Sequence, residues 1–277
     1  MVKFSICNEM FAGWSLREVA ELAAALGYRG IEIAPFTLAE SVCDVPMAER
    51  RRIRAVVEGA GLEVVGLHWL LVKPRGLHLN HPGDAVRRRT VDYLKALIDF
   101  CADVGGTVMV FGSPAQRRVL PGLAREQAWE YAVRAFRECG LAAQDRGITL
   151  CLEALPPDQT NFLNTTEEAI SMVRSVGNPN VQMALDVKSM CSEDGAIPDM
   201  IRSSSAHLKH FHANDANLNG PGFGDVDFVP VFRALREVGY QGFVSVEVFD
   251  CKPDPRTVAG GSLKYMRECL VRADDES

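Results

Sequence analysis

The chain has 277 residues, of which 47% are hydrophobic and 24% charged, and its formal net charge is −6. A chain of this length can bury a core large enough to fold without disulfides or a structural metal, and it contains no run of about 18 apolar residues that could cross a membrane. The acidic balance disfavours broad nucleic-acid binding, and the first residues lack the apolar stretch of a secretory signal.

Short β-branched apolar runs alternate eight times with longer amphipathic stretches. The apolar runs, which predict strands, are residues 3–7, 28–34, 62–68, 106–112, 148–154, 180–186, 207–213 and 242–248. The amphipathic stretches, which predict helices, are residues 15–26, 47–60, 84–103, 124–145, 166–176, 197–204, 228–238 and 256–272. Ser15 is expected to cap the first helix together with Glu18, three residues later.

Glycine follows several of the predicted helices, at the position where a left-handed C-cap favours it. Strands that alternate with helices predict a parallel sheet, and eight such units predict an α/β fold, a (β/α)8 TIM barrel. An open doubly wound sheet is the alternative, but it usually has fewer strands, and no G-x-G-x-x-G follows the first strand. No linker divides the chain, so residues 1–277 are expected to form a single domain.

The eight cysteines are spread along the chain and form no C-x-x-C pair. Several lie inside apolar runs, as Cys151 does in ITLCLEA. This distribution is typical of buried free thiols in a reducing compartment rather than of a disulfide framework. A cytoplasmic location is therefore expected.

Polar residues stand at the carboxyl ends of four consecutive predicted strands: Glu153, Asp186, His212 and Glu247. In a barrel these strand ends meet at one rim. Three carboxylates in a half-buried pocket would repel one another, and a divalent cation would allow them to coexist. An oxygen-rich set with one histidine suits Mn²⁺, Mg²⁺ or Co²⁺ better than the thiolate-rich sets of structural zinc do.

Each of these residues, taken alone, has a simpler explanation. A single Glu at a strand end is more often solvated, and a single His in an apolar strand more often belongs to the core. The same explanations apply to Glu32 and His68, which also fall at predicted strand ends. Four such residues on four consecutive strands are much harder to explain in this way, so the metal site is favoured.

The segments ITLCLEALPP, MALDVK, HFHANDANLNGPGFGDVDF and GFVSVEVF resemble the sugar-phosphate isomerase/epimerase superfamily, the xylose-isomerase-like TIM barrels. The similarity extends strand by strand over the whole chain, and the best-matched members are the ketose 3-epimerases of the tagatose and psicose type. The resemblance implies that one divalent metal ion is held by Glu153, Asp186, His212 and Glu247. It also implies that Glu153 and Glu247 form the catalytic acid/base pair.

The chemistry that the resemblance implies is epimerisation beside a carbonyl group of a small polyhydroxy substrate, a sugar or a sugar derivative. A metal that chelates the carbonyl and the adjacent hydroxyl would stabilise the enediolate. Two carboxylates on opposite faces could remove a proton and return it. The expected metal is Mn²⁺, with Mg²⁺, Co²⁺ or Zn²⁺ as alternatives.

Two positions depart from the ketose 3-epimerase pattern. Ser189 stands where those enzymes have a substrate-binding His, and no Arg follows His212 in HANDANLNG. The substrate is therefore not expected to be held as a free ketohexose is in those enzymes. Lys188 either binds a carboxylate or phosphate or extends its charged end to solvent at the rim. The expected substrate-binding residues are His68, Trp69, Lys188 and Asn214.

The endonuclease IV branch of the same superfamily is the nearest alternative. Its trinuclear zinc site uses further histidines at the ends of strands three, four and six and a D-x-H pair after strand seven. Here His68 matches the first, but strand four ends in Phe-Gly, residue 189 is Ser and the pair reads Asp-Val-Asp. Too few ligands remain for three metals.

Three classes of function stay open beside one another. The expected class is a metal-dependent isomerase or epimerase of carbohydrate metabolism. The same carboxylates and metal could instead run a dehydration, another lyase reaction or a hydrolysis on a keto-polyol. A non-enzymatic sugar-binding barrel would bind the metal and exchange no proton with solvent. No nucleic-acid or membrane partner is expected, and a homo-oligomer is left open.

Overall fold

The computed structural model describes residues 2–275. Eight parallel strands close into one barrel in chain order, and β1 pairs with β8. The strands are β1 (Lys3–Cys7), β2 (Gly30–Ile33), β3 (Glu63–Leu67), β4 (Val108–Phe111), β5 (Thr149–Glu153), β6 (Val181–Asp186), β7 (Leu208–Ala213) and β8 (Phe243–Val246). This topology confirms the predicted (β/α)8 barrel.

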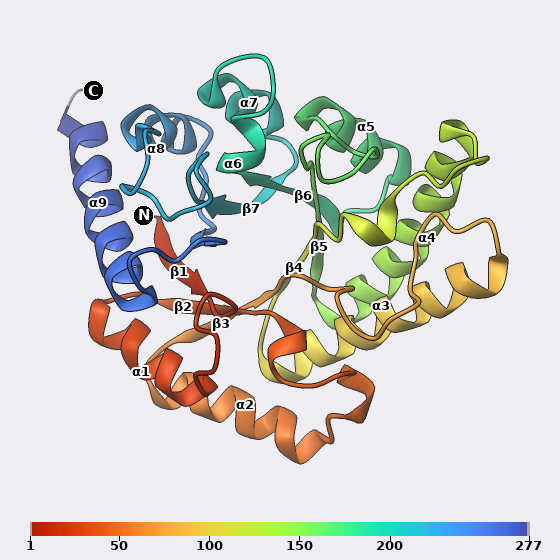
Figure 1. Cartoon of the computed structure of the whole chain (residues 1–277), viewed down its shortest axis with the longest axis horizontal. Coiled ribbons are helices and arrows are strands. Elements are labelled where there is room, and N and C mark those ends of the chain that lie inside the picture. Colours follow the sequence, from red (N-terminus) through yellow and green to blue (C-terminus); the bar gives the residue numbers. More distant parts are fainter. Residues whose placement is uncertain (1, 276–277) are drawn as a thin grey trace.

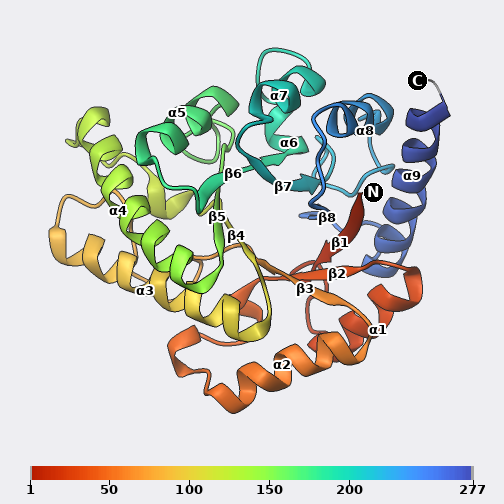
Figure 2. The same ribbon diagram turned by 180° about the vertical axis from the view of Figure 1, so that it is seen from behind.

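The longer helices form a ring around the strands (Figure 1), and Figure 2 shows the same ring from behind. They are α1 (Leu16–Leu26), α2 (Met47–Gly59), α3 (Asp84–Val104), α4 (Arg125–Arg146), α5 (Thr166–Val176), α7 (Ile197–Ser204), α8 (Phe228–Glu237) and α9 (Pro255–Asp275). Short turns lie in the loops: η1 (Pro35–Thr37), η2 (Val42–Asp44), η3 (Ala115–Arg117) and α6 (Val187–Met190). Helix α9 packs against α1 and so closes the ring.

The observed elements lie within a few residues of the predicted ones. Ser15 and Glu18 form the expected capping box, and Gly27 ends α1 in the left-handed conformation. Two differences bear on the site: β8 ends at Val246, one residue before Glu247, and the short helix α6, like η1, η2 and η3, was not predicted. Helix α6 begins because the Asp186 carboxylate accepts a hydrogen bond of 2.7 Å from the Ser189 N–H and so caps the turn.

Side chains alternate between the two faces of each strand, and this divides the core into two parts. Outward-facing residues such as Ile31 and Ile33 are fully buried in the main apolar core. Val110, Cys151 and Ala184 form a smaller separate cluster. Cys151 and Ala184 each stand two residues before a predicted metal ligand on the same strand face, so this cluster forms an apolar layer below the ligands.

All eight cysteines lie in the described part of the chain and are free. The expected burial holds for Cys7, Cys101, Cys139, Cys151 and Cys269, whereas Cys251 is intermediate and Cys43 and Cys191 are exposed. The two exposed cysteines lie outside the strands and long helices, where no apolar face covers them. Among residues 2–275, no helix has both the length and the apolar character needed to cross a bilayer.

Candidate functional site

The structure brings the four predicted metal ligands together at one end of the barrel. Glu153, Asp186, His212 and Glu247 are all buried, and each offers a ligand atom within 4.8 Å of those of the others. They come from β5, β6, β7 and the residue after β8, and Asp186 and His212 are direct register partners. Neighbouring strands of a closed barrel therefore account for the grouping.

The His212 ring points one nitrogen at the other ligands and the other nitrogen at a carboxylate below. Its Nδ1 lies 3.0 Å from an oxygen of Glu247 and 3.5 Å from an oxygen of Glu153. Its Nε2 lies 3.1 Å from Glu32 Oε1, and His210 Nε2 lies 2.7 Å from Glu32 Oε2. If both Nε2 atoms carry protons, Glu32 accepts both hydrogen bonds and His212 Nδ1 presents its lone pair to the ligand group.

Asp186 is held by hydrogen bonds to both of its oxygens. Ser189 N–H donates to Oδ1, and the Asn214 amide donates to Oδ2 over 2.5 Å. Asn214 also accepts a hydrogen bond of 2.7 Å from the Lys188 N–H. Asn214 is fully buried and is not among the residues that line the cavity described below. In this position Asn214 orients Asp186, and its expected contact with the substrate stays a prediction.

Glu153 is placed by two features of its surroundings. The buried Arg117 donates one hydrogen bond of 2.6 Å to the Glu153 carbonyl and another of 3.0 Å to the Leu163 carbonyl, which fixes the end of β5. Gly112, the residue after β4, leaves room for the carboxylate. A Cβ at position 112 would lie 2.5 Å from Glu153 Oε2, so a larger residue there would displace this ligand.

Glu247 and His68 each have a polar partner from the loops that follow the strands. The Trp69 indole N–H donates a hydrogen bond of 3.0 Å to Glu247 Oε1. His68 Nε2 lies 2.6 Å from Glu9 Oε2. Burial lowers the pKa of His68, but the Glu9 carboxylate outweighs burial and raises it to about 9. Glu9 therefore favours the protonated form of His68, at the edge of the ligand group.

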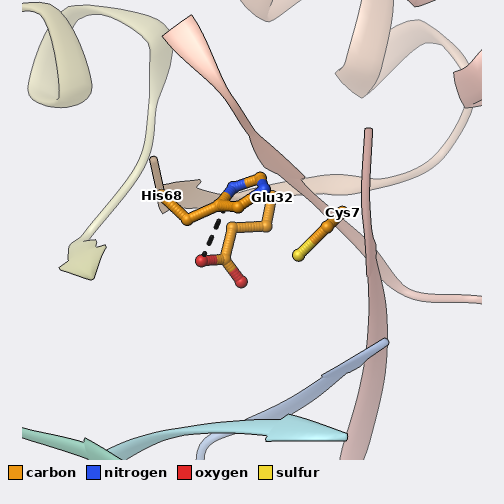
Figure 3. A group of neighbouring side chains, drawn as sticks. All are labelled: Cys7, Glu32 and His68. Atoms are coloured by element: carbon orange, nitrogen blue, oxygen red, sulfur yellow. Dashed lines mark ion pairs between the residues drawn. The ribbon is translucent and has the colours of Figure 1, made fainter. Parts of the chain in front are cut away.

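Glu32 lies at the centre of a buried polar layer below the ligands. Figure 3 shows its carboxylate turned toward the His68 ring, whose Nδ1 lies 3.9 Å from Glu32 Oε1, with the Cys7 thiol nearby. Both Glu32 oxygens are already within hydrogen-bond distance of histidines on β7. The group of Cys7, Glu32 and His68 therefore lies below the main site, and the Glu32 carboxylate positions the imidazoles of His210 and His212.

The charges of the site fit a divalent cation. Five carboxyl groups and three histidines gather there: Glu9, Glu32, Glu153, Asp186, Glu247, His68, His210 and His212. At most a few per cent of each side chain is exposed, apart from those of Glu9 and Glu153, which are slightly more open. Even with every imidazole protonated, ionised carboxylates would leave two uncompensated negative charges, which are costly to bury. His212 Nδ1 makes no well-aligned hydrogen bond within the described chain, although Glu247 Oε2 lies only 3.0 Å away. Three carboxylates and this nitrogen form a donor set that suits one divalent ion.

A cavity of about 330 Å³ opens above the ligands. All four predicted ligands line it, together with the predicted substrate-binding residues His68, Trp69 and Lys188. The sequence did not assign a role to Glu9, Glu32 or His210. A signal existed for the last two, because a Glu and a His inside apolar strands at inward-facing positions call for a buried partner. No comparable signal marked Glu9.

Metal affinity is expected to depend on pH. A plot of the logarithm of the metal dissociation constant against pH should change its slope near pH 7. In the metal-free protein, burial and the carboxylates of Glu153 and Glu247 raise the pKa of Asp186 to about 7. Burial lowers the pKa of His212, but Glu247 and Glu32 outweigh it and hold this pKa well above its ordinary value. Metal binding must displace these protons.

Above pH 7 only the His212 proton is displaced, and below it the Asp186 proton is displaced as well. The dissociation constant for Mn²⁺ should therefore rise by about a further tenfold per pH unit below pH 7. Isothermal titration of the metal-free protein between about pH 6 and 8 measures the slope. A slope that stays constant through pH 7 would show that Asp186 is already ionised before the metal binds.

Comparisons with known proteins agree with this architecture. A family model described as "Xylose isomerase-like TIM barrel" matches residues 20–269. A D-psicose 3-epimerase of Ruminiclostridium cellulolyticum is 27% identical over 92% of this chain and 85% of its own length. A D-psicose 3-epimerase of Agrobacterium fabrum is 36% identical over 54% of this chain and 51% of its own. A solved L-ribulose 3-epimerase superposes with a TM-score of 0.87 at 21% identity, over 100% of this chain and 97% of that one.

Proposed function

Because the chain belongs to the xylose isomerase-like TIM barrel family, we propose that it is an enzyme, a divalent-metal-dependent epimerase or isomerase of a small sugar or sugar derivative. The observation that carries this proposal is the convergence of Glu153, Asp186, His212 and Glu247 below one cavity. The psicose 3-epimerases that the chain resembles support the same reaction class.

The four converging residues would hold the cation. Mn²⁺ is the metal that we favour for three carboxylates and one imidazole, and Mg²⁺, Co²⁺ and Zn²⁺ are the alternatives. A bound divalent ion would supply a Lewis acid for the substrate oxygens. The buried hydroxyls of Ser113 and Ser189, which have no hydrogen-bond partner within residues 2–275, line the cavity and would bind further hydroxyl groups.

The two glutamates move the proton. One carboxylate takes the proton from the carbon beside the carbonyl, and the electron pair of the C–H bond moves into an enediolate of the substrate. The other glutamate, as a carboxylic acid, gives its proton to the same carbon from the opposite face, which inverts that centre. The two groups thereby exchange protonation states, and proton exchange with solvent restores the first.

Glu247 has the electrostatic surroundings of the base. Burial alone would raise its pKa, but the rings of His212 and His68 outweigh burial and leave the pKa below its ordinary value. Glu247 is thus ionised at neutral pH and can accept a proton. Glu153, on β5, is the partner in the reverse direction.

Proton exchange with solvent is the test of this function. The Mn²⁺-loaded protein is incubated in D₂O with a panel of ketoses and keto acids, and the products are followed by NMR. Deuterium at the carbon beside the carbonyl, together with the new epimer, is the expected result. Loss of water or chain cleavage would instead identify a lyase. Tight metal binding without exchange in any compound would leave a sugar-binding barrel and contradict the proposal.

Lys188 is expected to distinguish charged from neutral substrates. It is the single Lys or Arg among the described residues that line the cavity, and its Nζ lies 6.0 Å from the centre of the Phe249 ring. A charge-assisted hydrogen bond to a carboxylate or phosphate contributes about 1.5–3 kcal/mol. Lys188→Ala should therefore raise KM for an anionic substrate about tenfold or more, and for its neutral counterpart much less. Equal effects on both would place Lys188 at a solvated rim.

The proposal has three further parts. The first is that residues 1–277 form one domain, as a single closed barrel with its ring of helices suggests. The second is a cytoplasmic location, which the eight free cysteines favour. The third is that the substrate is a small molecule and that nucleic acid is not a partner, which the net charge of −6 favours.

A further inference from the structure

Large apolar side chains are exposed at the mouth of the cavity above the ligands. In residues 2–275, seven large hydrophobic residues are exposed, and three of them line this cavity: Trp69 at 37%, Val72 at 37% and Phe249 at 40%. Exposed apolar residues scattered singly are ordinary on a protein surface. Their concentration around the opening of one cavity is not, and it indicates an apolar ligand group at this end.

The aromatic part of this wall is held in a fixed position. The ring centres of Trp69 and Phe249 lie 6.1 Å apart, and those of Trp69 and Phe36 lie 6.0 Å apart. The Trp69 backbone has a φ of 53°, which is strained for a residue with a side chain. Its indole N–H is bound to Glu247. An exposed Trp with a strained backbone, whose indole N–H donates a hydrogen bond to a carboxylate of the site, is preorganised to contact a ligand.

The remaining lining of the cavity includes both polar and apolar residues. The polar residues are the ligand group, the unpartnered hydroxyls of Ser113 and Ser189, and the side chains of His68, Gln116, Gln159 and Lys188. Of these, Lys188 lies next to the aromatic wall, with its Nζ 6.0 Å from the centre of the Phe249 ring. The apolar part continues from the aromatic wall through Leu155, Pro114 and Ala115. A free sugar offers this apolar part only the C–H groups of one of its faces, whereas an aromatic or aliphatic substituent would match it over its whole surface. A cavity of about 330 Å³ lies in the size range of sites for drug-sized ligands.

We propose that the mouth of the cavity, formed by Trp69, Val72 and Phe249, is a subsite for an apolar substituent of the substrate. The substrate class is then a keto sugar that carries an aromatic or aliphatic group away from the reacting carbons, such as an aryl glycoside or an aryl ether. This inference rests on the proposed function for the sugar end of the ligand. The subsite itself is a binding property, and it can be measured separately from turnover.

The test uses sugars in matched pairs, with and without an aryl group. One pair is 3-dehydro-D-glucose and phenyl 3-dehydro-β-D-glucopyranoside, and the other is D-fructose and 6-O-benzyl-D-fructose. For the Mn²⁺-loaded protein, calorimetry gives the dissociation constants and NMR in D₂O gives kcat/KM for proton exchange. In at least one pair the aryl compound should bind at least about fivefold more tightly, because stacking and burial of one ring contribute on this scale.

Two variants of the wall and one matched control locate the effect. Phe249→Ala should reduce the aryl preference at least about threefold. Val72→Thr, which keeps the side-chain shape and adds a hydroxyl, should reduce it less. Val271→Thr is the control, because Val271 lies on α9, is 60% exposed and does not line the cavity. It should leave the preference unchanged.

The outcomes separate the subsite from the proposed reaction. An aryl preference that Phe249→Ala removes supports the subsite, even if no compound exchanges a proton and the proposed function fails. A preference below fivefold in both pairs, or one that neither wall variant changes, overturns the subsite. Sedimentation of the wild type and Phe249→Ala tests whether the wall is instead a contact between subunits. If the variant changes only the oligomeric state, the wall is a subunit contact and the inference is wrong.

Discussion

Glu247→Gln is expected to slow epimerisation of the substrate at least about 100-fold while the protein still binds its metal, because a positioned general base typically contributes about 10²–10⁴-fold in rate. Glutamine keeps the shape of the side chain and one oxygen donor but cannot accept a proton at neutral pH. Alanine would be a poorer probe, since it would remove a metal ligand together with the base.

The surroundings of Glu247 make one control necessary. Its Oε1 accepts the Trp69 indole hydrogen bond, and its Oε2 lies 3.0 Å from His212 Nδ1. In the glutamine variant, Trp69 competes with the metal for the single amide oxygen. Metal occupancy of each preparation must therefore be measured, and rates compared per bound metal ion.

Glu153→Gln provides the complementary measurement. If the two glutamates work on opposite faces, both variants lose epimerisation, but each keeps deuterium exchange without inversion for one of the two epimers. The epimer that still exchanges should differ between the variants. A fully loaded Glu247→Gln protein with near-normal turnover would show that Glu247 is only a ligand and that the two-glutamate mechanism is wrong.

The barrel could be predicted from the sequence because each level of the pattern pointed to the same structure. Apolar runs marked the strands, and amphipathic stretches marked the helices between them. Glycines such as Gly27 marked the helix ends, and Gly27 has the left-handed φ of 99° that this position requires. No local sequence pattern predicts that β1 pairs with β8 to close the barrel. Only the number of repeated units, eight, implied this pairing.

The grouping of Glu153, Asp186, His212 and Glu247 could be predicted for the same reason, because the carboxyl ends of all strands in a parallel barrel meet at one rim. The hydrogen bonds of Glu32 with His210 and His212, which lie below this group, could not be predicted. Glu32 and His210 are 178 residues apart in the chain, and their contact depends on which strands face each other across the barrel. Asn214 is a related case: the sequence places it near the site, but only the structure shows that its amide donates a hydrogen bond to Asp186.

Glu32→Gln is expected to weaken metal binding about 10- to 100-fold without unfolding the protein, as is typical when the hydrogen-bond partner of a metal-binding histidine is changed. The carboxylate of Glu32 accepts from Nε2 of both His210 and His212. Glutamine has one acceptor and one donor. Its amide can satisfy only one of the two N–H groups, and its NH₂ favours the His212 tautomer with the proton on Nδ1, the nitrogen that faces the other ligands.

Glu9→Gln is the matched control for this variant. It also removes one negative charge from a largely buried carboxylate, and Glu9 is paired with His68 in a group that includes Glu247. His68 is not one of the four ligands, so the tautomer of His212 is unaffected, and the Mn²⁺ dissociation constant should change far less. If both variants weaken binding equally, lost negative charge explains the effect. Wild-type affinity in Glu32→Gln would mean that the ligand group orients His212 without help from Glu32.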